Sequence, residues 1–157
     1  MGSLILKTLS AALLALPVLG GAALGAEDGK AIYERANCVG CHKWHGGGGG
    51  GYGGAALSLR GTQMDRDQLI EVIQCGRPGT RMPFHDKHAW STVKCFGMDE
   101  KPSGDGAPSQ AAEFLTPEEI ASVADYVTAN IKGKGKPDRA DCVAFWGEGA
   151  KQCQSYK

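Results

Sequence analysis

Residues 38–42 of this chain are Cys38, Val39, Gly40, Cys41 and His42, which gives the spacing Cys-x-x-Cys-His. This spacing is the signature of a haem joined covalently to its protein. Two thiols three positions apart in a short turn can each add to one of the two haem vinyl groups. The next residue carries an imidazole that can reach the iron from the same side. The sequence therefore predicts one covalent haem c, attached through Cys38 and Cys41, with His42 as an axial iron ligand.

Met82, within Arg81-Met82-Pro83, is the residue that we expect on the opposite side of the iron. Pro83 fixes the backbone beside it, and the position follows a predicted helix. A His and a Met together give a closed, six-coordinate iron of the kind used for moving single electrons. Other residues with a suitable sulfur or nitrogen stay open as ligands: Met64, Met98, His45, His85 and His88.

The same cysteines have a second interpretation, which is a zinc site. Cys-x-x-Cys is half of many zinc sites, and Cys75 and Cys95 offer further thiolates. Zinc does not require a His directly after the second Cys, however, so haem is favoured. A thioredoxin-like redox pair is disfavoured because no alternation of strands and helices surrounds the motif.

The N-terminal segment has the order of a secretory signal peptide. Lys7 precedes an apolar run over residues 9–19, and a stretch of small residues ends at Ala26. The run is shorter than the roughly 20 residues that span a bilayer, and Pro17 argues against the alternative of an uncleaved membrane anchor. We therefore expect residues 1–26 to be removed and the mature protein to lie in a bacterial periplasm, with no stable membrane insertion.

Six cysteines are present, and four remain once two are assigned to haem. An even number of spare thiols outside the cytoplasm favours disulfides. Three connectivities are open, and the sequence does not choose among them. Our expectation is local pairing, Cys75 with Cys95 and Cys142 with Cys153. The first of these bonds would enclose Met82 in a loop, and we hypothesise that it keeps the iron–sulfur bond closed.

Three segments have the apolar periodicity of helices. They are residues 28–37, 65–74 and 116–131. In the last of them, Thr116 is an N-cap, Pro117 takes the first helical position and Glu119 completes a capping box. A glycine run over residues 46–54 and a polar stretch over 97–110 are predicted loops.

Together these features resemble a class I cytochrome c. The resemblance rests on Gly29 and Tyr33 ahead of the haem motif, on the Met82-Pro83 element and on Tyr126 in the terminal helix, and it covers roughly residues 27–131. It implies an all-α fold with three main helices and long loops around one covalently bound haem. The first and last helices of that family cross closely, and Gly29 and Tyr126 fit the crossing.

Two features depart from the family pattern. One is the set of four extra cysteines, and the other is the C-terminal extension over residues 132–157. We expect this extension to be stapled by a disulfide and packed on the cytochrome c domain, residues 27–131. Such additions are similar to those of bacterial cytochromes that serve one periplasmic dehydrogenase, such as a quinoprotein alcohol dehydrogenase.

The resemblance implies an electron-transfer protein rather than an enzyme. It would take single electrons from a periplasmic dehydrogenase and pass them to another cytochrome or an oxidase, as a monomer or within a transient complex. Two alternatives stay open: a haem subunit of a dehydrogenase complex, and a haem peroxidase or gas-binding protein if Met82 is not an iron ligand.

Charge adds little to these expectations. The chain has 17 basic and 17 acidic residues, which gives a formal net charge of zero. No basic block interleaved with aromatic residues is present, so we expect no nucleic-acid partner. Arg60 is our candidate for a contact with a haem propionate.

Overall fold

The computed structural model describes residues 28–51 and 54–156. The expected signal peptide, residues 1–26, lies outside the described residues. Within the described ranges, no helix is both long enough and apolar enough to cross a membrane.

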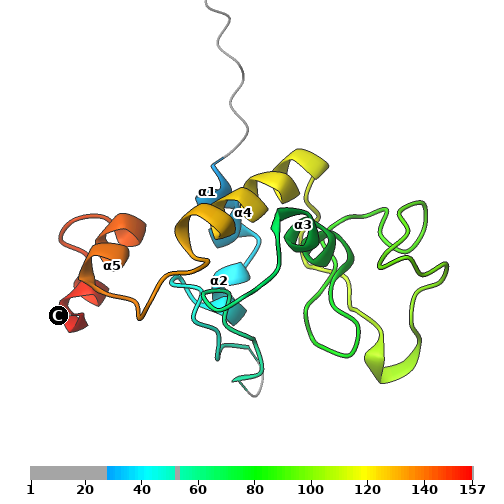
Figure 1. Ribbon diagram of the computed structural model, residues 1–157, viewed down its shortest axis with the longest axis horizontal. Helices are drawn as coiled ribbons and strands as arrows, with labels where there is room; N and C mark the ends of the chain where they lie inside the picture. The colour runs from blue at the N-terminus through cyan, green and yellow to red at the C-terminus, as the bar shows by residue number, and fades with distance from the viewer. Residues whose placement is uncertain (1–27, 52–53, 157) are drawn as a thin grey trace, which may run out of the picture.

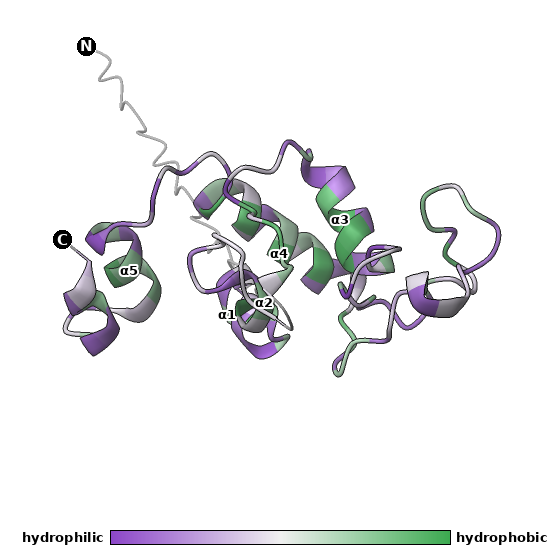
Figure 2. Ribbon diagram, turned by 90° about the horizontal axis from the view of Figure 1, so that it is seen from below, coloured by the Kyte–Doolittle hydropathy of each residue, from purple (hydrophilic) through white to green (hydrophobic). Residues whose placement is uncertain are grey.

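Three helices form the centre of the molecule: α1 (Gly29–Arg35), α3 (Arg66–Cys75) and α4 (Pro117–Asn130). Helix α4 packs against both of the others (Figure 1). Apolar residues run along α3 and α4 (Figure 2), and the buried ones other than Cys75 join a single core cluster. Residues 28–51 and 54–156 contain isolated β-bridges but no strand. The expected all-α fold with three main helices is confirmed.

Capping boxes open two of the three central helices, and the one predicted at Thr116 has the expected geometry. At α4, the Thr116 side chain accepts from the Glu119 amide at 3.3 Å and the Glu119 side chain accepts from the Thr116 amide at 2.7 Å. A second capping box opens α3, where Asp65 and Gln68 play the same two roles. Helix α1 ends earlier than its periodicity suggests, because Asn37 adopts a left-handed conformation with φ of 61°.

Helices α1 and α4 cross at very short range. A Cβ atom on Gly29 would lie 2.0 Å from the carbonyl oxygen of Ser122 and 2.8 Å from the Cβ of Tyr126. The rings of Tyr33 and Tyr126 lie 5.6 Å apart beside this crossing. Only a residue without a side chain fits at position 29, which confirms the crossing expected at Gly29 and Tyr126.

The C-terminal extension contains helical structure that the sequence analysis did not predict. It forms α5 (Arg139–Trp146) and the 3-10 helix η3 (Lys151–Ser155) at one end of the molecule (Figure 1). A disulfide between Cys142 and Cys153 joins the two. Phe145 is 5% exposed and belongs to the main core cluster, so the extension contributes directly to the core.

Candidate haem site

The two cysteines of the motif lie on a helix of one turn and a half, α2 (Cys38–His42), which follows α1 after the left-handed Asn37. They are the cysteines that form no disulfide. Burial raises the pKa of the Cys38 thiol to about 12, so this sulfur is held as a neutral thiol near neutral pH. The arrangement offers two unpaired thiols one helical turn apart, the spacing at which the two haem vinyl groups accept them.

The His42 imidazole has a fixed orientation. Its Nδ1 lies 3.0 Å from the carbonyl oxygen of Leu57. A carbonyl oxygen can only accept, so Nδ1 carries the proton and donates, and Nε2 keeps a free lone pair. Burial also lowers the pKa of His42, which favours the neutral imidazole that binds metals. The donor set of thiol, thiol and oriented imidazole fits a covalently bound haem iron.

The glycine run after the motif closes the end of α2, a role that the sequence analysis did not find. The Gly48 amide donates to the His42 carbonyl at 3.2 Å, and the Gly50 amide donates to the Cys41 carbonyl at 2.9 Å. A Cβ atom on Gly50 would lie 2.3 Å from that same Cys41 oxygen. Because glycine has no side chain, the backbone of the glycine run packs directly on the backbone at the C-terminal end of α2.

Met82 lies on a segment that runs back along the C-terminal end of α3. The last carbonyls of α3 accept from this segment: Ile73 from the His85 amide at 3.1 Å, and Gln74 from the Asp86 amide at 3.2 Å. Gly76, with φ of 67°, permits the approach, because a Cβ there would lie 2.8 Å from the Met82 carbonyl oxygen. The half-buried Met82 side chain is thus carried by a backbone that completes the hydrogen bonding of α3.

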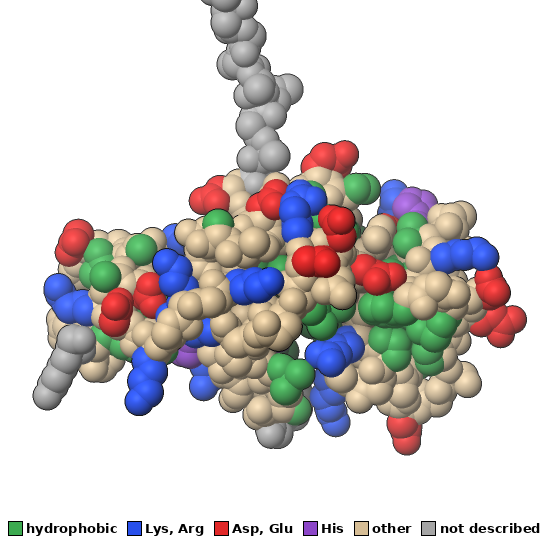
Figure 3. Space-filling model, in the orientation of Figure 1, with side chains coloured by type: hydrophobic (Ala, Val, Ile, Leu, Met, Phe, Trp, Pro, Cys, Tyr) green, Lys and Arg blue, Asp and Glu red, His purple; other side chains and the backbone are tan. Residues whose placement is uncertain are grey.

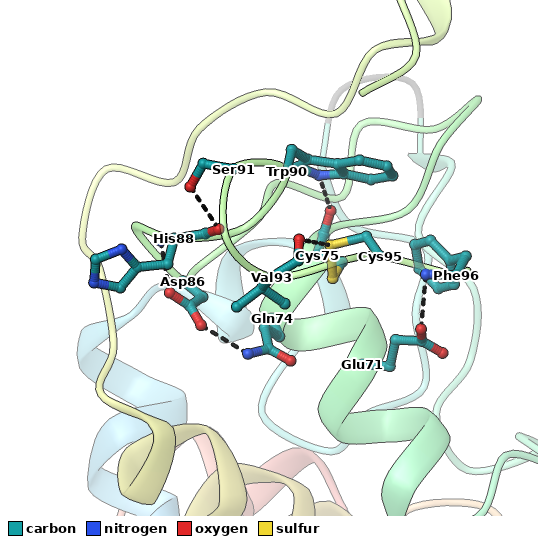
Figure 4. Close-up of a disulfide and its surroundings, with 10 residues drawn as sticks. All are labelled: Glu71, Gln74, Cys75, Asp86, His88, Trp90, Ser91, Val93, Cys95 and Phe96. Atoms are coloured by element: carbon teal, nitrogen blue, oxygen red, sulfur yellow. Dashed lines mark hydrogen bonds between the residues drawn. A yellow bond between two sulfur atoms is a disulfide. The ribbon is translucent and has the colours of Figure 1, made fainter. Parts of the chain in front are cut away.

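The expected disulfide between Cys75 and Cys95 is present and ties the Met82 loop to α3. Figure 4 shows its surroundings: the Trp90 indole N–H donates to the Cys75 carbonyl at 2.8 Å, and the Phe96 amide donates to the Glu71 carboxylate at 2.7 Å. Because Cys75 and Cys95 are bonded to each other, they are not available as thiolates for the zinc site considered above. Within 28–51 and 54–156, no three His, Cys, Asp or Glu side chains are grouped to hold a metal ion.

Arg60 is buried and makes three hydrogen bonds. Its Nη1 donates to the His45 carbonyl at 3.0 Å, its Nε to the Gly135 carbonyl at 2.5 Å, and its Nη2 to the Asp141 carboxylate at 2.8 Å. A guanidinium has five N–H groups, so two remain for another acceptor. The contact with a propionate stays a prediction, whereas the link to the extension through Asp141 was not predicted.

The alternative imidazole ligands are placed differently from His42. The His45 Nδ1 accepts from the Gly47 amide at 2.9 Å. The His85 ring is 4% exposed, with its Nδ1 at 3.3 Å from the Glu113 carbonyl, and burial lowers its pKa. His88 is exposed. The structure thus puts His42 next to the two thiols and puts the ligand candidate Met82 on a separate, braced loop.

Comparison with known proteins gave one result for this chain. The family model described as Cytochrome c matches residues 26–130, which is more than half of the chain. A search of curated proteins and a search of solved structures gave no match. The matched range contains Cys38, Cys41, His42 and Met82, and it ends before α5.

Proposed function

The chain belongs to the cytochrome c family, and from that premise we propose that Cys38 and Cys41 hold its covalent haem c while His42 and Met82 coordinate the iron. The observation that carries this proposal is the hydrogen bond from His42 Nδ1 to the Leu57 carbonyl at 3.0 Å. Metal-binding histidines donate their second ring N–H in this way, which fixes the ring and raises its basicity. When bound, the haem supplies a one-electron redox couple.

The protein's own task in such a carrier is to keep both ligands in place while the charge on the iron changes. On the His42 side, the glycine run and the Leu57 carbonyl restrain α2 and the imidazole. On the Met82 side, the hydrogen bonds to α3 and the Cys75–Cys95 disulfide restrain the loop. Rigid ligands on both sides support electron transfer over catalysis at an open iron.

We assign the chain to electron transfer in the periplasm, between a dehydrogenase as donor and a second cytochrome or an oxidase as acceptor. The order of residues 1–26, the signal-peptide pattern, supports export, and the disulfides suit an oxidising compartment. The four extra cysteines and the extension support a dehydrogenase-associated carrier, such as one serving a quinoprotein alcohol dehydrogenase. Basic and acidic side chains are interspersed over the face in Figure 3, so charge alone does not mark the docking site there.

The test is carbon monoxide binding to the reduced, haem-loaded full chain. A closed His/Met iron binds the gas poorly at neutral pH, and the variant Met82→Ala should bind it readily. Met98→Ala is the matched control, because Met98 is also a half-buried methionine in a loop, and it should behave like the wild type. Ready binding by the wild type would contradict Met82 ligation and favour the gas-binding or peroxidase alternative. Mass spectrometry that finds no attached haem would refute the proposal as a whole.

A further inference from the structure

The C-terminal extension meets the domain at an ion pair that is withdrawn from solvent. The side chain of Arg60 is 8% exposed and that of Asp141 is 26% exposed, with Nη2 and Oδ2 at 2.8 Å. Both residues line a cleft of about 270 Å³ between the domain and the extension. Charges in such a position are weakly screened by water, so each is felt by its surroundings more strongly than a surface charge.

Arg60 belongs to the segment that orients His42. The Leu59 amide donates to the Gly46 carbonyl at 2.7 Å, and the Arg60 guanidinium donates to the His45 carbonyl at 3.0 Å. These bonds hold residues 57–60 against the chain that leaves the haem motif. The Leu57 carbonyl, which accepts from His42 Nδ1, lies on that same segment. Arg60 therefore lies three residues after the hydrogen-bond partner of the imidazole, on a segment that the Leu59 amide and the Arg60 guanidinium tie to Gly46 and His45.

Asp141 in turn is held by the architecture of the extension. Its amide donates to the N-cap Asp138 at 2.8 Å in the first turn of α5, and the next residue, Cys142, is half of the second disulfide. The Gly133 amide donates to the Arg60 carbonyl at 2.9 Å, so the extension contacts Arg60 at both the backbone and the side chain.

We propose that Asp141 is a positioning residue for the haem iron: it holds Arg60 and balances its charge, and so the C-terminal extension sets the reduction potential through the segment that orients His42. The proposal rests on the proposed function, namely a haem at Cys38, Cys41 and His42. Arg60 contacts the carbonyl of His45, three residues after the proposed ligand His42, and an unbalanced positive charge there favours the reduced iron, which carries one positive charge fewer. Loss of the Asp141 charge must therefore raise the potential.

The experiment measures the reduction potential of the haem-loaded full chain by spectroelectrochemistry. Asp141→Asn keeps the size and one acceptor oxygen but removes the charge, and its potential should rise. Asp141→Glu restores the charge and should return the potential close to that of the wild type. Glu148→Gln is the matched control, because Glu148 is an exposed carboxylate of the same extension, and its potential should not move.

Two further measurements separate the possible failures. Amide hydrogen exchange at residues 133–156 reports whether the extension stays docked in Asp141→Asn. If exchange increases while the reduction potential stays unchanged, Asp141 is only a structural anchor, and the proposal is overturned. In the double variant Arg60→Gln with Asp141→Asn, the two shifts in potential should not add, because one residue acts through the other. Additive shifts would overturn the relay through Arg60. A wild-type protein without haem would instead refute the proposed function itself.

Discussion

Replacing Gly29 by Ala should destabilise the protein, although alanine is the better helix former. The added Cβ would lie 2.0 Å from the Ser122 carbonyl oxygen, while ordinary van der Waals contact begins at 3.4 Å. Relief requires that α1 and α4 separate by about 1.4 Å, because the clashing atoms belong to the α4 backbone and cannot rotate away. Overpacking of this kind costs about 1–3 kcal/mol, and the upper end applies since Tyr126 is also too close.

The higher helix propensity of alanine offsets at most about 1 kcal/mol of this cost, so the free energy of unfolding should fall by about 2 kcal/mol. For a domain of this size, that lowers the midpoint of thermal unfolding by about 8 °C. The assay is thermal unfolding of the haem-loaded protein, followed by circular dichroism. Gly61→Ala is the matched control, because a Cβ there meets nothing within 4 Å, and it should be neutral or stabilising by up to about 1 kcal/mol. If Gly29→Ala melts at or above the wild type, the close crossing of α1 and α4 is wrong.

Three further predictions concern the loop around Met82 and the caps. Removing the Cys75–Cys95 bond, which closes a sequence separation of 20 residues, should lower the free energy of unfolding by roughly 3 kcal/mol and abolish the Met–iron absorption band at the red end of the spectrum. Removing the Cys142–Cys153 bond of the extension should cost a similar amount and leave that band in place. If the band persists in both variants, the Cys75–Cys95 bond does not hold the iron–sulfur bond closed. Burial lowers the pKa of His85 in the folded chain below 6.5. As the pH drops from about 6.5 toward that lowered pKa, the unfolded chain takes up a proton that the folded chain does not, so the free energy of unfolding falls. His85→Gln should flatten this part of the stability curve measured by urea unfolding, and an unaltered slope would count against it. Thr116→Ala should cost about 1 kcal/mol through loss of the α4 cap, whereas Thr116→Ser should be close to neutral in the same urea assay.

Local signals predicted the elements that have strong local causes. The α4 start follows from Thr116, Pro117 and Glu119, whose side chains and ring satisfy the helix end without help from distant residues. The attachment motif likewise defines its own chemistry over five residues. Both disulfides formed between the nearest spare cysteines, as local pairing suggests.

The features that the sequence did not predict depend on contacts between distant segments, which no local pattern reveals. The glycine run is a closing element for α2 only because its amides reach the carbonyls of residues 40–42. Arg60 meets Asp141 across a separation of 81 residues. Helix α5 did leave a signal, since Asp138 precedes it as an N-cap and Cys142 and Phe145 fall on one face, but the run is only eight residues long and its stability comes from the disulfide and the core.

The burial of Cys38 has a consequence for biogenesis. Disulfide exchange proceeds through the thiolate, and a pKa of about 12 leaves almost none of that species at neutral pH once α1 and α2 have packed. The four remaining cysteines pair within short stretches of chain. Before haem is attached, both disulfides can therefore form between near neighbours while the folded chain keeps Cys38 as a slowly exchanging thiol, and we expect any pairing of this sulfur with a wrong cysteine to occur before α1 and α2 assemble.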